Sequence, residues 1–307
     1  MIGFFKTVEK VLTNTITKYM RNTQKSEAEC IEIIEEKLNY LHSQYKTLDR
    51  LIPVNYDDPL CRFAYLYTYV GAHANMTEDA LRRFAHVLGD EIVGFSNQPV
   101  KYKICALGGG PGSELLGIVK FLELNLNKTD YIRMDFKLVD YVRSWQDSWQ
   151  QLKDNVDDYF RINNGEDWRN WPIHIESASL VLDLLRIEDF ANVDVFSGVN
   201  LIIFNHVISE LINSLEEFRE IFNIMVNTCP DETKFLFIDI DQRQVVDEID
   251  RLLEGEARLE ILDQWNGTFQ VDPSEDKADL GKWNKVLSGK PRLKCQAFYK
   301  ICYKIDW

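Results

Sequence analysis

A cluster of four glycines between a short apolar run and a helical pattern constrains this chain more than any other feature. The sequence from Lys103 to Leu122 reads KICALGGGPGSELLGIVKFL. Lys103 to Leu107 is typical of a buried strand, and the apolar residues after Ser113 recur at helical spacing. Glycines allow positive φ and close approach to the backbone, so this turn suits a polar ligand at a helix N-terminus, with Ser113 as the expected N-cap. The glycines alone are equally consistent with a tight turn between a strand and a helix that binds no ligand, as occurs in any α/β domain.

Beyond residue 100 the pattern alternates between short apolar runs and helical segments. Further buried strands are predicted at 136–140, 199–204 and 234–240. A third strand is expected either at 168–175 or within LVLDLL around Asp183. Alternation of strands and helices indicates a parallel sheet. The strand patterns at 259–265 and 296–305 follow one another with a polar stretch between them, which predicts an antiparallel strand. We therefore expect an α/β fold with a doubly wound, seven-stranded, mostly parallel sheet and an antiparallel C-terminal strand.

The first 99 residues read as helices. Ser26 and Glu29 form a capping-box pattern before a long amphipathic run that should end at Pro53. Asp58 and Pro59 are suited to the N-cap and first position of a second helix, and Thr77 to the N-cap of a third. We expect residues 1–99 to form a helical N-terminal cap that helps to bind substrate, and residues 100–307 to form the α/β domain.

Charge and cysteine content limit the partners and the compartment. The formal net charge of −14 disfavours nonspecific binding to nucleic acid or anionic membrane. A local basic patch could still exist on such an acidic protein. The six cysteines form no CxxC pair, which favours reduced thiols inside the cell, and we expect a cytoplasmic protein. No secretion signal or bilayer-spanning stretch is recognisable. The five histidines are not closely spaced, so no metal site is predicted.

The spacing of the glycines distinguishes two kinds of nucleotide-cofactor turn. The dinucleotide pattern GxGxxG would need glycine at position 113, where this chain has Ser113, whereas GxGxG is present from Gly108 to Gly112. This turn, the acid Asp140 at the tip of the second strand and the terminal strand pair resemble class I S-adenosylmethionine-dependent methyltransferases. The resemblance spans residues 100–307 and leaves the helical N-terminus unmatched.

The resemblance implies S-adenosylmethionine as cofactor, S-adenosylhomocysteine as product, and a set of binding residues. Asp140 would accept hydrogen bonds from the ribose hydroxyls, because an ionised carboxylate is a strong bidentate acceptor. Tyr141 would lie against the adenine, and Asp183 would meet its amino group. Asn205 and His206 would face the methyl group and the acceptor as catalytic residues. The glycines expected to pass close to the cofactor are Gly108, Gly109, Gly110 and Gly112.

Two departures from the resemblance narrow the chemistry. Many relatives have an acid two positions before the first glycine, where this chain has Ala106, and Glu114 is the residue that could replace it from the helix. The fourth strand runs into FNHVISEL, without the Asn/Asp-Pro-Pro-aromatic motif of enzymes that methylate the adenine amino group. We therefore set that subclass aside.

Structural alternatives stand beside these roles. Asp140 could be a solvated strand end, and His206 could satisfy local backbone groups. Asp239 and Asp241 alternate along a strand, so only one of them can face the site. An acceptor pocket could also draw on Tyr65, Tyr67, Tyr69 and His73, but helical spacing favours different faces and ordinary packing.

Three functions are consistent with the sequence. The first is methyl transfer to a nucleophilic nitrogen, oxygen or sulfur of a small molecule or protein, with the acceptor and the oligomeric state unidentified. The second is RNA methylation, which would need a basic groove. The third is a non-catalytic binding or scaffold protein, for which Ala106 is the main support. The basic residues that an RNA groove could use are Lys101, Lys103, Arg161, Arg169, Lys282, Lys285, Lys290 and Arg292.

Overall fold

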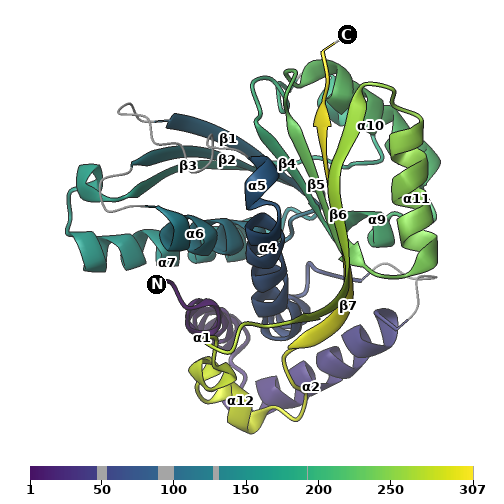
Figure 1. Cartoon of the computed structure of the whole chain (residues 1–307). Coiled ribbons are helices and arrows are strands. Elements are labelled where there is room, and N and C mark those ends of the chain that lie inside the picture. The colour runs from purple at the N-terminus through teal and green to yellow at the C-terminus, as the bar shows by residue number, and fades with distance from the viewer. Residues whose placement is uncertain (47–53, 89–99, 127–130, 192, 307) are drawn as a thin grey trace.

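One seven-stranded sheet organises the molecule (Figure 1). The computed structural model describes residues 1–46, 54–88, 100–126, 131–191 and 193–306. The strand order is β3-β2-β1-β4-β5-β7-β6. The strands are β1 (Val100–Leu107), β2 (Ile132–Asp140), β3 (Ile173–Val181), β4 (Leu201–Asn205), β5 (Lys234–Ile240), β6 (Leu259–Gln270) and β7 (Lys294–Lys304).

The pairing of the strands confirms the fold class expected from the sequence. Strands β1 to β5 pair in parallel, and β7 is antiparallel to both β5 and β6. The strand order reverses between β1 and β4, and in open α/β sheets ligands bind at the carboxyl ends of the strands beside such a reversal. The ends of β1, β2 and β4 are therefore the part of the fold where a site is expected.

The third strand is β3, Ile173–Val181, so neither sequence alternative had its bounds right. Residues 168–170 form a short 3-10 helix, and Asp183 follows the strand by two residues. Residues 173–181 alternate in burial only at the start of the strand, which explains why the pattern was weak.

Helices cover both faces of the sheet, as a doubly wound fold requires. On one face lie α4 (Gly71–Arg83), α6 (Ser113–Asn125) and α7 (Trp145–Asn164), and on the other lie α10 (Leu215–Thr228) and α11 (Arg243–Glu254) (Figure 1). Successive side chains of a strand point to opposite faces. Ile104 thus joins the apolar cluster under α6 and α7, whereas Cys105 joins the one under α10 and α11.

The N-terminal helices confirm two of the predicted starts. These helices are α1 (Phe4–Thr23), α2 (Glu27–Gln44), α3 (Pro59–Tyr65), the π-helical turn η1 (Leu66–Val70), α4 and α5 (Ala85–Leu88). The capping box of Ser26 and Glu29 is formed at the start of α2. Asp58 accepts a hydrogen bond from the Leu60 amide as the N-cap of α3, with Pro59 at the first position.

Two expected caps are wrong. Thr77 lies inside α4, where its hydroxyl donates to the carbonyl of His73 one turn earlier and so caps nothing. The N-cap of α6 is Gly112 in the left-handed conformation, and Ser113 is already the first helical residue. The predicted helix end at Pro53 and the domain boundary after residue 99 lie outside the described residues.

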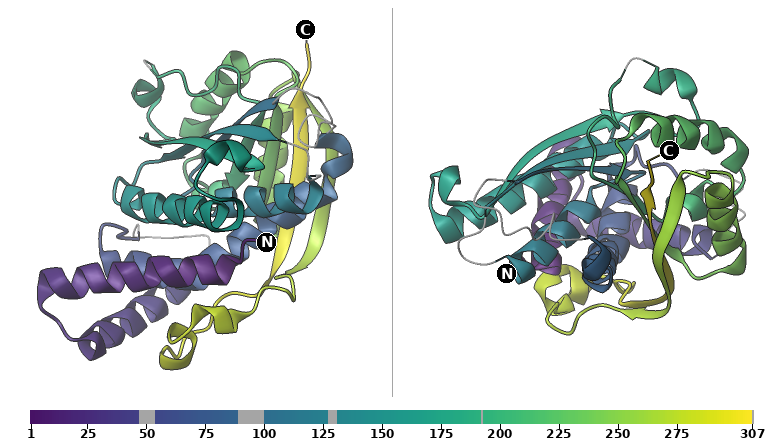
Figure 2. Two further views of the ribbon diagram at one scale, coloured as in Figure 1. Left: turned by 90° about the vertical axis from the view of Figure 1, so that its left-hand side faces the viewer. Right: turned by 45° about the horizontal axis from the view of Figure 1, so that its top comes forward.

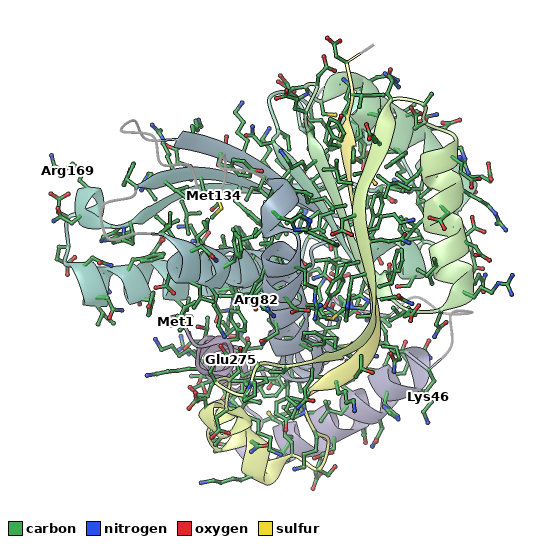
Figure 3. The ribbon with its side chains drawn as sticks, viewed as in Figure 1. Met1, Lys46, Arg82, Met134, Arg169 and Glu275 are labelled. Atoms are coloured by element: carbon green, nitrogen blue, oxygen red, sulfur yellow. The ribbon has the colours of Figure 1, made fainter. Side chains whose placement is uncertain are left out.

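The N-terminal helices and the β6–β7 connection pack into one unit with the sheet. The connection, residues 271–293, packs against α1 and α2 and includes η3 (Lys277–Leu280) and α12 (Trp283–Val286) (Figure 2). Buried Glu275 accepts hydrogen bonds from the Phe4 amide and the Lys120 ammonium group, beside the start of α1 (Figure 3). A single apolar cluster contains residues of α1, α4, α6 and β2. Among the described helices, we find none long and apolar enough to cross a bilayer.

Candidate active site at the carboxyl ends of the strands

The glycine turn adopts a backbone that side-chained residues would disturb. Gly108, Gly110 and Gly112 have φ of +57°, +49° and +85°. A Cβ atom on Gly112 would lie 2.3 Å from Cε3 of Trp149, and one on Gly109 would lie 2.3 Å from Leu138. One side of the turn therefore packs tightly against Trp149 and Leu138, and the turn itself lies at the ends of β1 and β2.

Asp140 ties the end of β2 to this turn. Its Oδ2 atom accepts a hydrogen bond of 2.9 Å from the Gly110 amide, and Oδ1 accepts one of 2.8 Å from the Val142 amide. Burial raises the pKa of Asp140 to about 6, and the two amide hydrogen bonds oppose that rise. Nearby Glu210 raises the pKa further. Asp140 is thus a strong acceptor held in a fixed position rather than a solvated strand end.

A cavity of about 400 Å³ opens beside Asp140. Four of the sequence-predicted residues line it, and they come from the ends of three strands: Gly108, Asp140, Tyr141 and Asp183. Its volume lies in the range of roughly 300–1,000 Å³ typical of small-molecule sites. Tyr141 is 58% exposed, so its ring lies at the rim. Asp183 is fixed by a hydrogen bond from the Leu185 amide to its Oδ1 atom.

Glu114 and Asn205 form a buried polar pair next to the glycine turn. Glu114 Oε1 accepts hydrogen bonds from Asn205 Nδ2 at 2.9 Å and from Ser113 Oγ at 3.0 Å. Burial raises the pKa of Glu114 to about 7, against the effect of these hydrogen bonds. Within the described part of the chain, Glu114 Oε2 and Asn205 Oδ1 are buried and have no hydrogen-bond partner. Two acceptor atoms are therefore left for a donor.

His206 follows Asn205 in a strained conformation. Its φ is +60°, and its amide donates a hydrogen bond of 2.7 Å to the Ile238 carbonyl. The ring stacks on that of His73, with 4.4 Å between centroids, and Nδ1 lies 3.5 Å from Asp239 Oδ1. Asp239 is buried, whereas Asp241 lies at the surface near Asn266, so only one of the two acids faces inward, as expected.

An aromatic group from the N-terminal helices covers the same region. Tyr65, Tyr69 and His73 are successive neighbours along one face of α3, η1 and α4. Tyr67 points elsewhere, and its hydroxyl donates to the Gly289 carbonyl. The expectation that these residues would occupy different faces therefore holds only for Tyr67. The spacing of four between the other three was the signal that could have grouped them.

Sequence reasoning missed Tyr45, Tyr56 and Glu210. The Tyr45 hydroxyl donates a hydrogen bond of 3.0 Å to Glu210 Oε1 and lies 2.6 Å from the Tyr56 hydroxyl. Tyr56 and Glu210 both line the cavity. Tyr45 and Glu210 are 165 positions apart, so no local pattern in the sequence links them.

The strand order, the antiparallel β7 and the glycine turn after β1 agree with the α/β fold that the resemblance to class I S-adenosylmethionine-dependent methyltransferases implied. No family model matches the chain, and no curated protein matches it.

Solved structures with a similar arrangement include three methyltransferases. An S-adenosylmethionine-dependent methyltransferase from Clostridium acetobutylicum is 10% identical, with a TM-score of 0.44 over 80% of this chain and 98% of that one. A putative class I enzyme from Listeria monocytogenes is 10% identical, with a TM-score of 0.42 over 99% and 88%. The N-methyltransferase NodS from Bradyrhizobium japonicum, in complex with S-adenosylhomocysteine, is 11% identical, with a TM-score of 0.39 over 88% and 99%. At these low identities and TM-scores, the similarities do not identify the molecule that would accept a methyl group.

Proposed function

We propose that this protein is an S-adenosylmethionine-dependent methyltransferase that acts on a nucleophilic nitrogen, oxygen or sulfur of a small molecule or protein. The observation that carries the proposal is the placement of acceptor groups along the carboxyl ends of β1, β2 and β3. Asp140 and Asp183 line the cavity, and Glu114 has a buried oxygen without a partner in the described chain. These acceptors suit the donor groups of an adenosyl amino acid.

The residues present fit the cofactor part by part. Asp140 would accept hydrogen bonds from the ribose hydroxyls, while Tyr141 and Asp183 would contact the adenine. Glu114 Oε2 and Asn205 Oδ1 would accept hydrogen bonds from the α-ammonium group, which offers three donors to two buried acceptors without partners in the described chain. Glu114 thereby supplies the carboxylate that Ala106 lacks.

The protein's part in the reaction is alignment and exclusion of water. The bound cofactor would supply a methyl group already activated by its sulfonium sulfur. An in-line displacement then needs the acceptor atom held against that methyl group, which lowers the entropic part of the barrier. The tyrosines of the N-terminal helices, closed over the site by the Tyr45–Glu210 hydrogen bond, would keep water out.

The positions of the basic residues favour a small-molecule or protein acceptor over RNA. Lys101 lies near Glu176, Arg161 pairs with Asp158, and Arg169 pairs with Asp167. Lys282, at the start of α12, pairs with Glu27 of α2, and α12 (Figure 1) lies far from Arg169 at the edge of the sheet (Figure 3). Partnered and scattered cations do not make a groove for a phosphate backbone.

Thermal unfolding with added ligands tests the cofactor assignment. A ligand that binds only the folded state stabilises it by about 2.7 kcal/mol at a concentration 100 times its dissociation constant. We expect S-adenosylhomocysteine to raise the melting temperature and NAD⁺ to leave it unchanged. A rise with NAD⁺ alone would replace the proposal with a dinucleotide site, and no rise with either would favour the non-catalytic scaffold.

A further inference from the structure

Three buried side chains, His73, His206 and Asp239, form a polar row with the half-buried Tyr65 beside the proposed methyl-transfer site. The Tyr65 hydroxyl lies 3.4 Å from His73 Nδ1, and His206 Nδ1 lies 3.5 Å from Asp239 Oδ1. The stacked rings of His73 and His206, inclined by 29°, join the two pairs. This polar row of side chains thus leads from the tyrosines of the N-terminal helices to the end of β5.

The carboxyl group of Asp239 faces His206. Its Oδ2 atom accepts a hydrogen bond from the Ser209 amide and Oδ1 accepts one from the Ile240 amide, so both oxygens are fixed in position. The residue is 1% exposed, so water does not compete for its oxygens. A carboxylate next to one imidazole nitrogen selects the tautomer with its proton on that nitrogen. The tautomer that fits this contact has its proton on Nδ1 of His206 and leaves the lone pair of Nε2 free.

Nε2 of His206 has no hydrogen-bond partner in the described chain, although it is buried. Buried polar atoms are rarely left unpaired, and those that are call for an explanation such as a catalytic role. The left-handed backbone of His206 adds to this, since strained non-glycine residues cluster at functional sites. Two independent features of the same residue thus indicate a use beyond packing.

His73 keeps the ring of His206 in place and adds no charge to it. Burial lowers the pKa of His73 well below its ordinary value, and His206 and Arg292 lower it further. Asp239 of β5, Tyr65 of α3 and Tyr69 of η1 lie against the stacked pair, and Arg292, from the segment before β7, is near enough to act on His73 electrostatically. A neutral ring stacked at 4.4 Å restricts rotation of its neighbour.

We infer that His206 Nε2 is the proton acceptor for the methyl acceptor, with Asp239 and His73 as positioning residues. This inference rests on the proposed methyltransferase function. It deepens that function because it names the chemical class of the acceptor atom: one that carries a proton, such as a hydroxyl, a thiol or an N–H group. A neutral amine differs from these groups because it can attack with its free lone pair and lose its proton afterwards, so it needs no base before attack.

The proton and electron balance follows from these positions. The bond from the acceptor atom to the methyl carbon forms while the carbon–sulfur bond breaks, and its electron pair stays on sulfur. The proton of the acceptor atom moves to Nε2 of His206, which becomes an imidazolium facing the carboxylate of Asp239. The proton leaves to water when the products are released, and the neutral ring is restored.

Nitrogen NMR of the whole protein tests the tautomer directly. The protein, labelled with ¹⁵N at histidine, is saturated with S-adenosylhomocysteine, and ring nitrogens are correlated with ring protons. We expect His206 to show a protonated Nδ1 and an unprotonated Nε2. We expect Asp239→Asn to lose this preference and His73→Phe, which retains a stacked ring, to keep it. Asp241→Asn is the matched control at the same strand end and should resemble the wild type.

Separate outcomes bear on the inference and on the function beneath it. If S-adenosylhomocysteine binds but His206 of the wild type carries its proton on Nε2, the inference is overturned and the methyltransferase function stands. An Asp239→Asn protein that binds S-adenosylhomocysteine and keeps the wild-type tautomer would also overturn it. If S-adenosylhomocysteine does not bind the wild type, both fail.

Discussion

Cofactor binding would change the protonation of two carboxyl groups at this site. Asp140 and Glu114 have pKa values raised by burial to about 6 and about 7. Hydrogen-bond donors from a ligand favour the ionised forms, so binding would release protons and strengthen as the pH rises. The same burial makes each carboxylate costly for the protein without ligand.

Removal of Asp140 tests the ribose assignment. Hydrogen bonds to a charged group contribute about 1.5–3 kcal/mol each, so losing two in Asp140→Ala should cost about 3–6 kcal/mol and weaken S-adenosylhomocysteine binding by about 150-fold or more. Equilibrium dialysis with the radiolabelled ligand measures this change. Asp147→Ala, which removes an exposed acid on α7, serves as the control. Equal affinity in Asp140→Ala and the wild type would refute the assignment.

Glu114 should make the protein less stable as the pH rises. Its folded pKa of about 7 lies above the ordinary value of 4.5, so the folded state binds more protons between these values. Stability is therefore lost as the pH rises from about 4.5 to 7, by about 3 kcal/mol from this group. Urea unfolding at pH 5 and pH 7.5 measures the slope. Glu114→Gln should lose less stability over this range than the wild type, and an unchanged slope would contradict the assignment.

At the scale of elements, the strand–turn–helix unit around the glycines depends on tight packing against α7. Gly112→Ala combines left-handed strain of about 1 kcal/mol with overpacking against Trp149 of about 1–3 kcal/mol, so we expect a loss of about 2–4 kcal/mol in unfolding free energy. Gly110→Ala is a matched control, because its added Cβ would lie 3.6 Å from Trp145, an ordinary contact. Denaturant unfolding of both variants should show a much smaller loss for Gly110→Ala. Equal losses would mean that the contact with Trp149 is unimportant.

Elements specified by local rules were predictable from the sequence. The capping box of Ser26 and the cap at Asp58 each join residues two or three positions apart, and the glycine turn is likewise local. Thr77 was mistaken for a cap because the same side chain can bond back to the preceding turn, and only the continuation of α4 decides between the two.

Features that depend on distant parts of the chain were not predictable. The place of Asp183 depended on the bounds of β3, whose second half has no buried residue and no alternating pattern. The pairing of Glu210 with Tyr45 and the stacking of His73 on His206 join separate helices and strands. The residues of the cofactor pattern could therefore be named from the sequence, whereas most of the surrounding pocket could not.

At the scale of the whole molecule, a buried ion pair joins α6 to the β6–β7 connection, and the same acid accepts the amide of Phe4 at the start of α1. Lys120 of α6 and Glu275 of the β6–β7 connection are 2.7 Å apart, and their side chains are only 3% and 4% exposed. The N-terminal helices, whose tyrosines cover the site, are thus held to both the sheet and the β6–β7 connection.

Breaking this pair should destabilise the whole protein. Glu275→Ala leaves the ammonium group of Lys120 buried and unpaired, and we expect a loss of about 3–5 kcal/mol with a single unfolding transition. Asp147→Ala removes the exposed pair with Lys18 and should cost less than about 1 kcal/mol. Urea unfolding followed by circular dichroism and tryptophan fluorescence compares them. Similar losses for both variants would show that the buried pair does not anchor the helices.

Cofactor binding by the intact protein is the central claim. Calorimetric titration of S-adenosylhomocysteine into the wild type at about pH 6, where both carboxyl groups are still substantially protonated, measures it without knowledge of the acceptor. We predict saturable binding of one ligand per chain, accompanied by proton release as Asp140 and Glu114 ionise. The absence of binding at millimolar ligand would contradict the methyltransferase function.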